Sequence, residues 1–267
     1  MKRHVSATLD IEVTDATSLE FKIAVARNPA SELSESLTFT LDGDRIDARE
    51  ILAEHGTRVH LLEVAPGSLH VEYSASVAGK GDPPPVTDYD ISKYLRPSRY
   101  AEADKFFGFT GGEFDLSKPK AELVQDITNW VGSRLLYQGG SSRSTDSAVD
   151  TMLSGAGVCR DFAHLTVALL RAVTIPARLV AVYAPGCDPM DFHAVVEAFV
   201  DEQWRVVDAT QLAPRESLMR IATGRDAADT AFLDNHGGAI TLENTVVTAV
   251  VDGEFPSDDY RTPTSLT

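Results

Sequence analysis

Residues 155–164 have the sequence Gly-Ala-Gly-Val-Cys-Arg-Asp-Phe-Ala-His, and the elements on either side are interpreted from this stretch. The glycines interrupt regular structure, and apolar residues then recur at helical spacing from Cys159 to Val173, until Pro176 ends the pattern. Cys159 is therefore predicted to open a helix. The amide groups at a helix start favour a thiolate and can bind an oxyanion during acyl transfer. A small buried cysteine is the alternative interpretation of this position.

A cysteine nucleophile needs a base, and His193 is the best candidate among the seven histidines. His164 lies five residues along the predicted helix, roughly 140° around its axis from Cys159, so we expect it to be a structural residue. His193 lies in the alternating segment 192–200, which predicts a strand with His193 and Val195 on one face. For His193 considered alone, a hydrogen-bonded core histidine is the alternative.

A carboxylate follows the next predicted strand, residues 203–207. A tight hairpin would pair Val200 with Gln203. In that register Asp208 is the diagonal neighbour of His193, roughly 7–8 Å away between backbones. An aspartate there can accept the far ring N–H of the histidine and fix its tautomer. A slip of one residue would place the two side chains on opposite faces of the sheet, so the interpretation depends on this register.

The first 80 residues form a predicted β domain. Apolar and polar residues alternate in segments that turn-prone residues separate, as in half-buried antiparallel strands. These segments are residues 4–13, 19–25, 37–41, 58–64 and 69–77. The run Gly-Lys-Gly-Asp-Pro-Pro-Pro at residues 79–85 breaks regular structure and is predicted to be an interdomain linker.

A second domain is predicted over residues 87–251, and a flexible tail over residues 252–267. The domain mixes helical and strand patterns. The predicted helices are residues 120–136, 146–154 and 159–173, and the predicted strands are residues 177–183, 192–200, 203–207 and 240–251. The expected fold class is α+β, in which the helix that carries the cysteine packs on an antiparallel sheet, preceded by a small β-sandwich-like domain.

The composition limits the partners. Hydrophobic residues make up 43% of the 267 residues, and 24 basic residues against 40 acidic ones give a net charge of −16. Such a charge repels nucleic acid and anionic lipid, and no apolar run is long enough to span a membrane. The N-terminus lacks the apolar segment of a signal peptide, so we expect a cytoplasmic protein in which Cys159 and Cys187 are reduced. A disulfide between them is the alternative.

The chain resembles the bacterial transglutaminase-like superfamily over about residues 87–232, in separate motifs that occur in the family's order. The motifs of the nucleophile, the histidine and the aspartate correspond to residues 157–164, 191–194 and 207–210. The segment Ile-Pro-Ala-Arg at residues 175–178 and the flanking segments 94–100 and 224–226 are also typical of this branch.

The resemblance implies a papain-like core and acyl transfer at amide bonds, with Cys159 as nucleophile, His193 as general base and acid, and Asp208 as the residue that orients the base. It also implies that the Cys159 backbone amide supplies half of an oxyanion hole. We assign the other half to Tyr137, for which a half-buried aromatic near a helix end is the alternative. Family members usually carry an aromatic where this chain has Val195, which leaves the substrate-facing wall in question.

The predicted substrate rim consists of Arg160, Val195 and Arg225. The expected enzyme is a cysteine protease or amidase that hydrolyses peptide or amide bonds through a thioacyl intermediate, without a cofactor or metal. Acyl transfer to an amine and a catalytically silent binding protein of the same fold are the alternatives. A zinc site is disfavoured, because the chain lacks a close ligand pair such as C-x₂-C.

Overall fold

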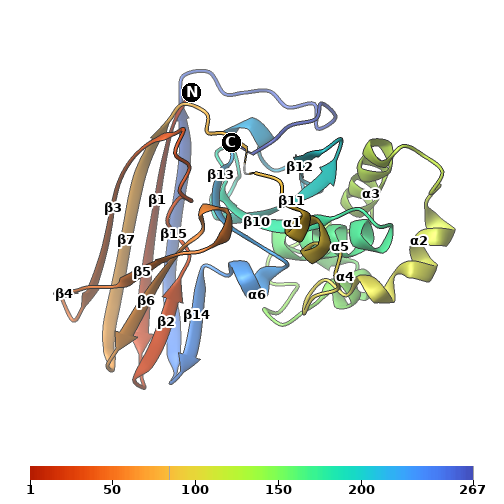
Figure 1. Ribbon diagram of the computed structural model, residues 1–267. Coiled ribbons are helices and arrows are strands. Elements are labelled where there is room, and N and C mark those ends of the chain that lie inside the picture. Colours follow the sequence, from red (N-terminus) through yellow and green to blue (C-terminus); the bar gives the residue numbers. More distant parts are fainter. Residues whose placement is uncertain (84, 267) are drawn as a thin grey trace.

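The computed structural model describes residues 1–83 and 85–266, and it places a β-sandwich beside a half in which helices pack on a four-stranded sheet (Figure 1). The sandwich has two antiparallel sheets, with the strand orders β15-β1-β7-β3-β4 and β14-β2-β6-β5. Its strands are β1 (Lys2–Val13), β2 (Thr17–Phe21), β3 (Glu32–Leu41), β4 (Asp44–Ile46), β5 (Arg49–Leu52), β6 (Arg58–Val64), β7 (Gly67–Ala78), β14 (Leu233–Gly237) and β15 (Ile240–Asp252). Alternate side chains of both sheets join one apolar core.

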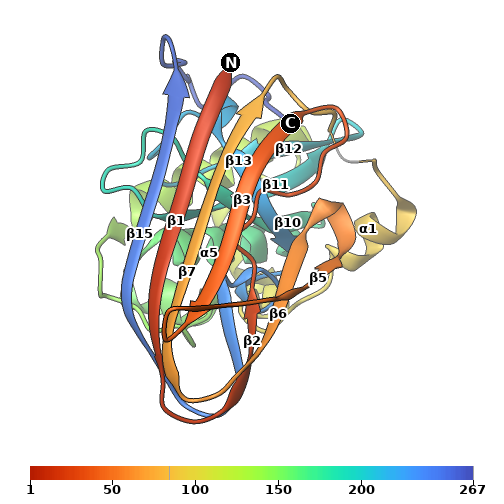
Figure 2. The same cartoon turned by 90° about the vertical axis from the view of Figure 1, so that its left-hand side faces the viewer.

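Two strands of the sandwich come from the far end of the chain. β15 pairs with β1, from Lys2 opposite Asp252 to Val13 opposite Ile240, and β14 pairs with β2. Figure 2 shows β15 next to β1 at the edge of the larger sheet. Both segments fall within the predicted second domain, residues 87–251, where only residues 240–251 are predicted to be a strand, and the pairing places both segments in the sandwich. Alternation identifies a strand, but it does not identify the partner of that strand.

The second half contains one antiparallel sheet with the order β12-β11-β10-β13. Its strands are β10 (Ala177–Tyr183), β11 (Phe192–Val200), β12 (Gln203–Val207) and β13 (Met219–Gly224). The helices are α1 (Asp88–Lys93), α2 (Phe107–Glu113), α3 (Lys120–Arg134), α4 (Ala148–Ser154), α5 (Cys159–Ala172) and α6 (Ala227–Thr230). No helix within the described ranges is both long enough and apolar enough to cross a membrane.

Helix α5 is the centre of this half. It lies between the sheet on one side and α3 and α4 on the other, and its side chains from Asp161 to Ala172 are all buried. Leu165, Leu169 and Val196 belong to the apolar core that this packing creates. The predicted bounds of the strands at residues 177–183, 192–200 and 203–207 are confirmed, and so is the α+β fold class.

The sheet of the second half also packs against the sandwich. Tyr183, Met219 and Ile221 share the apolar core of the sandwich. The Tyr183 hydroxyl donates a hydrogen bond of 2.7 Å to the carbonyl oxygen of Ile23. The sheet that carries His193 is therefore held between α5 and the sandwich, on packed rather than mobile elements.

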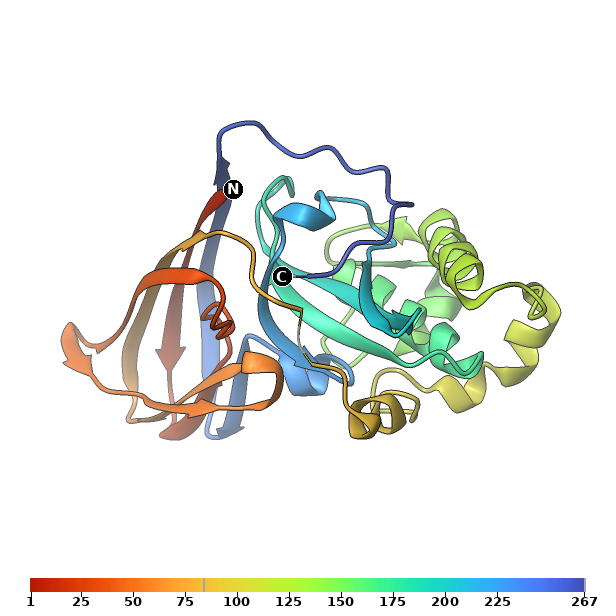
Figure 3. The same ribbon diagram turned by 45° about the horizontal axis from the view of Figure 1, so that its top comes forward.

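The tail predicted to be flexible is packed over residues 253–266. It leaves β15, crosses to the helical half and turns back (Figure 3). The amide of Val206 donates to the carbonyl of Thr264 at 2.8 Å, and the Asp258 carboxylate binds the Arg215 guanidinium at 2.8 Å. These long-range contacts correct the sequence-based expectation, because a polar segment without periodicity carries no local sign of them.

Candidate active site

Cys159 is the first residue of α5, and the turn before it leaves the helix start open. Val158 is extended, and no side chain caps the first-turn amide groups. The Asp161 carboxylate instead accepts the amide of Val158 at 2.8 Å. A Cβ on Gly157 would lie 2.6 Å from the Cβ of Asp161, so only glycine fits in this turn. The thiol is partly exposed at the start of a helix whose first turn has no side-chain cap.

His193 and Asp208 meet on the neighbouring sheet. β11 pairs with β12 from Val200 opposite Gln203 to Val196 opposite Val207, which confirms the predicted register. His193 Nε2 donates to Asp208 Oδ2 at 2.8 Å, and the two side chains are almost fully buried. The sequence-predicted pair is therefore brought together by the hairpin, as an ion pair inside the protein.

Cys159 lies against the other edge of the imidazole. Its Sγ is 4.0 Å from the carbonyl oxygen of Phe192, the residue before His193, and the thiol acts on the imidazole as a hydrogen-bonding neighbour. His193 Nδ1 is buried and has no other hydrogen-bond partner among the described residues. The three predicted triad residues are thus adjacent, with Nε2 committed to the aspartate and Nδ1 facing the thiol.

The charged forms of His193 and Asp208 stabilise each other. Burial alone lowers the pKa of His193. The charge and hydrogen bond of Asp208, together with the neighbouring Cys159, outweigh burial and raise that pKa well above its usual value. Burial alone raises the pKa of Asp208, and His193 and Thr210 outweigh it and lower that pKa. The imidazole is therefore held as an imidazolium beside an ionised carboxylate. Its positive charge also favours the thiolate form of Cys159, which faces Nδ1.

Tyr137 lies next to Cys159. The strands β8 (Leu136–Tyr137) and β9 (Ala156–Gly157) pair in parallel and carry Tyr137 alongside the start of α5. Burial and the neighbouring Cys159 raise the pKa of the phenol, so the hydroxyl keeps its proton at neutral pH. The ring lies 5.8 Å from that of Phe162 between centroids.

Two of the three residues predicted to form the substrate rim lie elsewhere in the structure. Val195 is 1% exposed and packs in an apolar cluster with Val180 and Val206. Its side chain is therefore buried in the protein and is not open to a substrate. The carbonyl of Arg225 accepts from Arg171 near the C-terminal end of α5, about 18 Å along the helix from Cys159. These two residues do not line the site.

Arg160 turns toward the loop beside α5. Its guanidinium donates to the carbonyl of Arg143 at 2.8 Å and to the Ser142 hydroxyl at 3.0 Å, and it pairs with Asp161 at 3.1 Å. It therefore fixes the loop that flanks the thiol. About a quarter of the side chain stays exposed, so a contact with substrate at the rim remains a proposal.

Two residues near the thiol have no role in the sequence analysis. Cys187 is 7% exposed, and burial raises the pKa of its thiol, while His193 and Cys159 both act on it as neighbours. Asp191 precedes β11, and burial raises the pKa of its carboxyl next to His193. Both belong to the loop that enters the histidine strand, and proximity in sequence to His193 is the signal that points to them.

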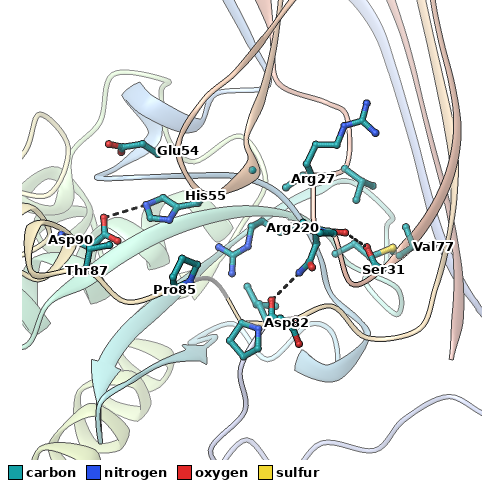
Figure 4. Close-up of a pocket in the computed structure, with 18 of the residues that line it drawn as sticks. Arg27, Ser31, Glu54, His55, Val77, Asp82, Pro85, Thr87, Asp90 and Arg220 are labelled. Carbon is teal, nitrogen blue, oxygen red and sulfur yellow. Dashed lines mark hydrogen bonds and ion pairs between the residues drawn. The ribbon is translucent and has the colours of Figure 1, made fainter.

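The structure also contains a separate cavity of about 530 Å³ between the sandwich and the second half. Figure 4 shows His55 turned toward Asp90, 3.5 Å away, with Arg27 and Arg220 on the other side. Neither Cys159 nor His193 lines this cavity. The candidate active site and the cavity are therefore distinct places in the molecule.

Comparisons with known proteins show which family and which solved structure the chain is similar to. The family model described as the transglutaminase-like superfamily matches residues 111–209. A solved structure of a candidate cysteine protease from Cytophaga hutchinsonii is 32% identical, and the match covers 97% of this chain and 93% of that one with a TM-score of 0.86.

Two curated relatives are uncharacterized proteins. One from Mycobacterium leprae is 28% identical over 151 residues, which is 54% of each chain. One from Mycobacterium tuberculosis is 29% identical over 204 residues, which is 70% of this chain and 58% of the relative. The chain spans a little over half the length of these two relatives.

Proposed function

The chain belongs to the transglutaminase-like superfamily, and from that premise we propose that it is a cysteine protease or amidase whose triad is Cys159, His193 and Asp208. The observation that carries the proposal is the buried His193–Asp208 pair, whose remaining ring nitrogen faces a thiol at an uncapped helix start. A nucleophile, a base and a group that orients the base are the parts that acyl transfer requires.

The reaction proceeds in two acyl-transfer steps. In the resting pair the Cys159 proton already lies on His193 Nδ1, and the Cys159 thiolate attacks the carbonyl carbon of an amide. The C–N bond breaks as His193 returns the proton to the leaving amine, which leaves a thioester on Cys159. A water molecule then gives a proton to His193 Nδ1 and attacks the thioester, which releases a carboxylic acid and restores the Cys159 thiolate beside the imidazolium. The acid loses its proton to water. Asp208 holds the imidazole and stabilises its positive charge in both steps.

The oxyanion formed in each step needs donors at a fixed place. The Cys159 backbone amide is one donor, because α5 begins there without a side-chain cap. The Tyr137 hydroxyl is our proposed second donor, since its phenol lies beside Cys159 and keeps its proton. Removal of one such donor typically costs about 10²–10³ in kcat.

Hydrolysis is favoured over transfer to an amine by one comparison. The similar structure from Cytophaga hutchinsonii is described as a candidate cysteine protease. Both outcomes share the same thioester, so the acceptor alone distinguishes them. A catalytically silent binding protein is the second candidate function, and the complete Cys-His-Asp cluster argues against it, because a site without catalytic use has no need to keep all three groups together.

Covalent labelling tests the proposal. The protein is treated with iodoacetamide or with an epoxysuccinyl inhibitor of cysteine proteases, and the labelled cysteine is identified by peptide mapping and mass spectrometry. We expect fast labelling of Cys159 and slow labelling of the buried Cys187. The labelling of Cys159 should collapse in His193→Ala. The matched control is His70→Ala, since His70 also bonds an aspartate, Asp10, at 2.6 Å but on the exposed face of the sandwich.

The outcomes separate the two candidate functions. Rapid labelling at one cysteine that depends on His193 and not on His70 supports an activated nucleophile, and a screen of peptide and amide substrates follows. Equal slow labelling of both cysteines, unchanged in His193→Ala, would support the silent binding protein.

A further inference from the structure

Asp208 lies just outside the sheet, so the strand does not fix its carboxylate. β12 ends at Val207, and Asp208 begins the loop that follows. The loop approaches α3 closely, since a Cβ on Gly132 would lie 2.5 Å from the carbonyl oxygen of Ala209. Something in the loop itself must hold the carboxylate toward His193.

Thr210 makes the contacts that do this. Its hydroxyl donates to Asp208 Oδ1 at 2.6 Å, and its backbone amide donates to the same oxygen at 2.9 Å. The other oxygen, Oδ2, is left to accept His193 Nε2 at 2.8 Å. The Thr210 hydroxyl is also 3.5 Å from that ring nitrogen. Two donors on one oxygen fix the plane of the carboxylate and favour its ionised form.

Gln211 and Tyr260 hold the backbone that follows Thr210 in place. Gln211 has a φ of 53°, in the left-handed region that is unfavourable for residues other than glycine. Its carbonyl oxygen accepts a hydrogen bond of 3.1 Å from the Tyr260 hydroxyl, which the packed tail supplies. Backbone strain kept in place beside a reactive cluster is typical of a functional constraint.

We propose that Thr210 is a positioning residue of this site, whose hydroxyl keeps Asp208 oriented toward His193 and thereby sustains the imidazolium that faces Cys159. The inference rests on the proposed function. The hydroxyl touches Asp208 and not the reacting atoms, so it acts through the aspartate. The other titratable groups around the His193–Asp208 pair are Cys159, Cys187, Asp191, Arg215 and Tyr260.

The experiment compares Thr210→Val, which removes the hydroxyl at nearly constant shape, with Thr210→Ser, which keeps it. The first readout is the rate of Cys159 alkylation by iodoacetamide between pH 4 and 9. The second is the titration of the His193 imidazole followed by NMR, which needs no reaction at the cysteine. The control is Thr166→Val, which removes a buried hydroxyl that donates to the Phe162 carbonyl at 2.8 Å within α5.

For Thr210→Val we expect alkylation at pH 6.5 to slow by about tenfold, with the midpoint of the profile moved to higher pH, because one hydrogen bond to a charged group is lost while the backbone donor stays. The His193 titration should move to lower pH. Thr210→Ser should restore both, and Thr166→Val should change neither.

Profiles and titrations of Thr210→Val that match those of the unchanged protein would overturn the proposal and leave the triad intact. A shift that Thr210→Ser does not restore would also overturn it, because the loss would then be one of packing. If the alkylation of Cys159 is slow and independent of His193 in the unchanged protein, the proposed function fails, and the NMR titration still decides whether Thr210 controls the Asp208–His193 pair.

Discussion

Strand β11 carries two buried ionic clusters on the same face, four residues apart, and they are built differently. Glu197 lies between Arg178 and Arg220, with contacts of 2.7 Å to each guanidinium. His193 pairs with Asp208 alone, at 2.8 Å, and keeps Nδ1 without a hydrogen bond to any described residue other than its thiol neighbour.

The difference separates a structural cluster from a reactive one. In the first cluster, both oxygens of Glu197 are used by arginines, and the stacked Trp204 ring, 4.0 Å from the Arg178 guanidinium, closes it. In the second cluster, one ring nitrogen is left open toward a partly exposed thiol. A buried ion pair in which both carboxylate oxygens are occupied holds a structure together, whereas a pair with an open position can exchange a proton.

The largest expected effect comes from breaking the reactive cluster. In Asp208→Asn the side chain can still lie beside His193, but it no longer stabilises an imidazolium, and amide donors can select the wrong ring tautomer. We expect turnover of any peptide or amide substrate to fall by about 10⁴-fold, with the fold retained. Near-normal turnover in a folded variant would show that Asp208 does not orient the base.

The control for this variant is Asp10→Asn. It removes the carboxylate from the exposed pair of Asp10 with His70 on the sandwich. Turnover should stay unchanged there, because that pair lies on the other half of the molecule.

Breaking the structural cluster should act on stability. Glu197→Gln leaves the buried guanidinium of Arg178 and the part-buried guanidinium of Arg220 without a carboxylate, and a broken buried pair costs about 3–5 kcal/mol. We expect urea unfolding at pH 7 to show this loss in the free energy of unfolding, while His193-dependent labelling persists in the molecules that remain folded. The exposed Glu243→Gln is the matched control. A loss below about 1 kcal/mol would mean that the cluster contributes little to the fold.

The pH dependence of stability sharpens the same contrast. Burial alone raises the pKa of Glu197, but the two arginines outweigh it and lower the pKa from 4.5 to about 2. A depressed carboxyl pKa contributes stability that is complete above pH 4.5 and is lost as the pH falls toward 2, which amounts to about 3 kcal/mol. Denaturant unfolding between pH 6 and 2 should show this loss in the unchanged protein, and Glu197→Gln should lack it. Parallel curves for both proteins would contradict the assignment.

The smallest effect is expected at Arg225, which the sequence analysis places at the substrate rim. Its side chain forms an exposed i, i+4 pair with Asp229 at the far end of α5. Because exposed pairs contribute about 0–1 kcal/mol, Arg225→Ala should change stability little and leave turnover and KM unaltered. A clear rise in KM would return Arg225 to the substrate-binding surface.

Local sequence patterns predict much of the second half and of the candidate site. Strand alternation and helix punctuation give the bounds of β10, β11 and β12, and the hairpin register from Val200 to Gln203 follows from its two-residue loop. That loop has positive φ at both Asp201 and Glu202, 51° and 58°, although neither residue is glycine or asparagine. The pairing of His193 with Asp208 is predictable because the two are joined by this local hairpin.

The contacts between distant segments are visible only in the folded protein. The pairing of β15 with β1, the packing of the tail on Arg215 and the burial of Val195 depend on contacts between residues far apart in the chain. Periodicity reports which face of an element is apolar, but it does not report what covers that face. Thr210 shows the same limit, because its hydroxyl gains a role only once the loop brings it back to Asp208, and no repeat in the sequence encodes where a loop turns.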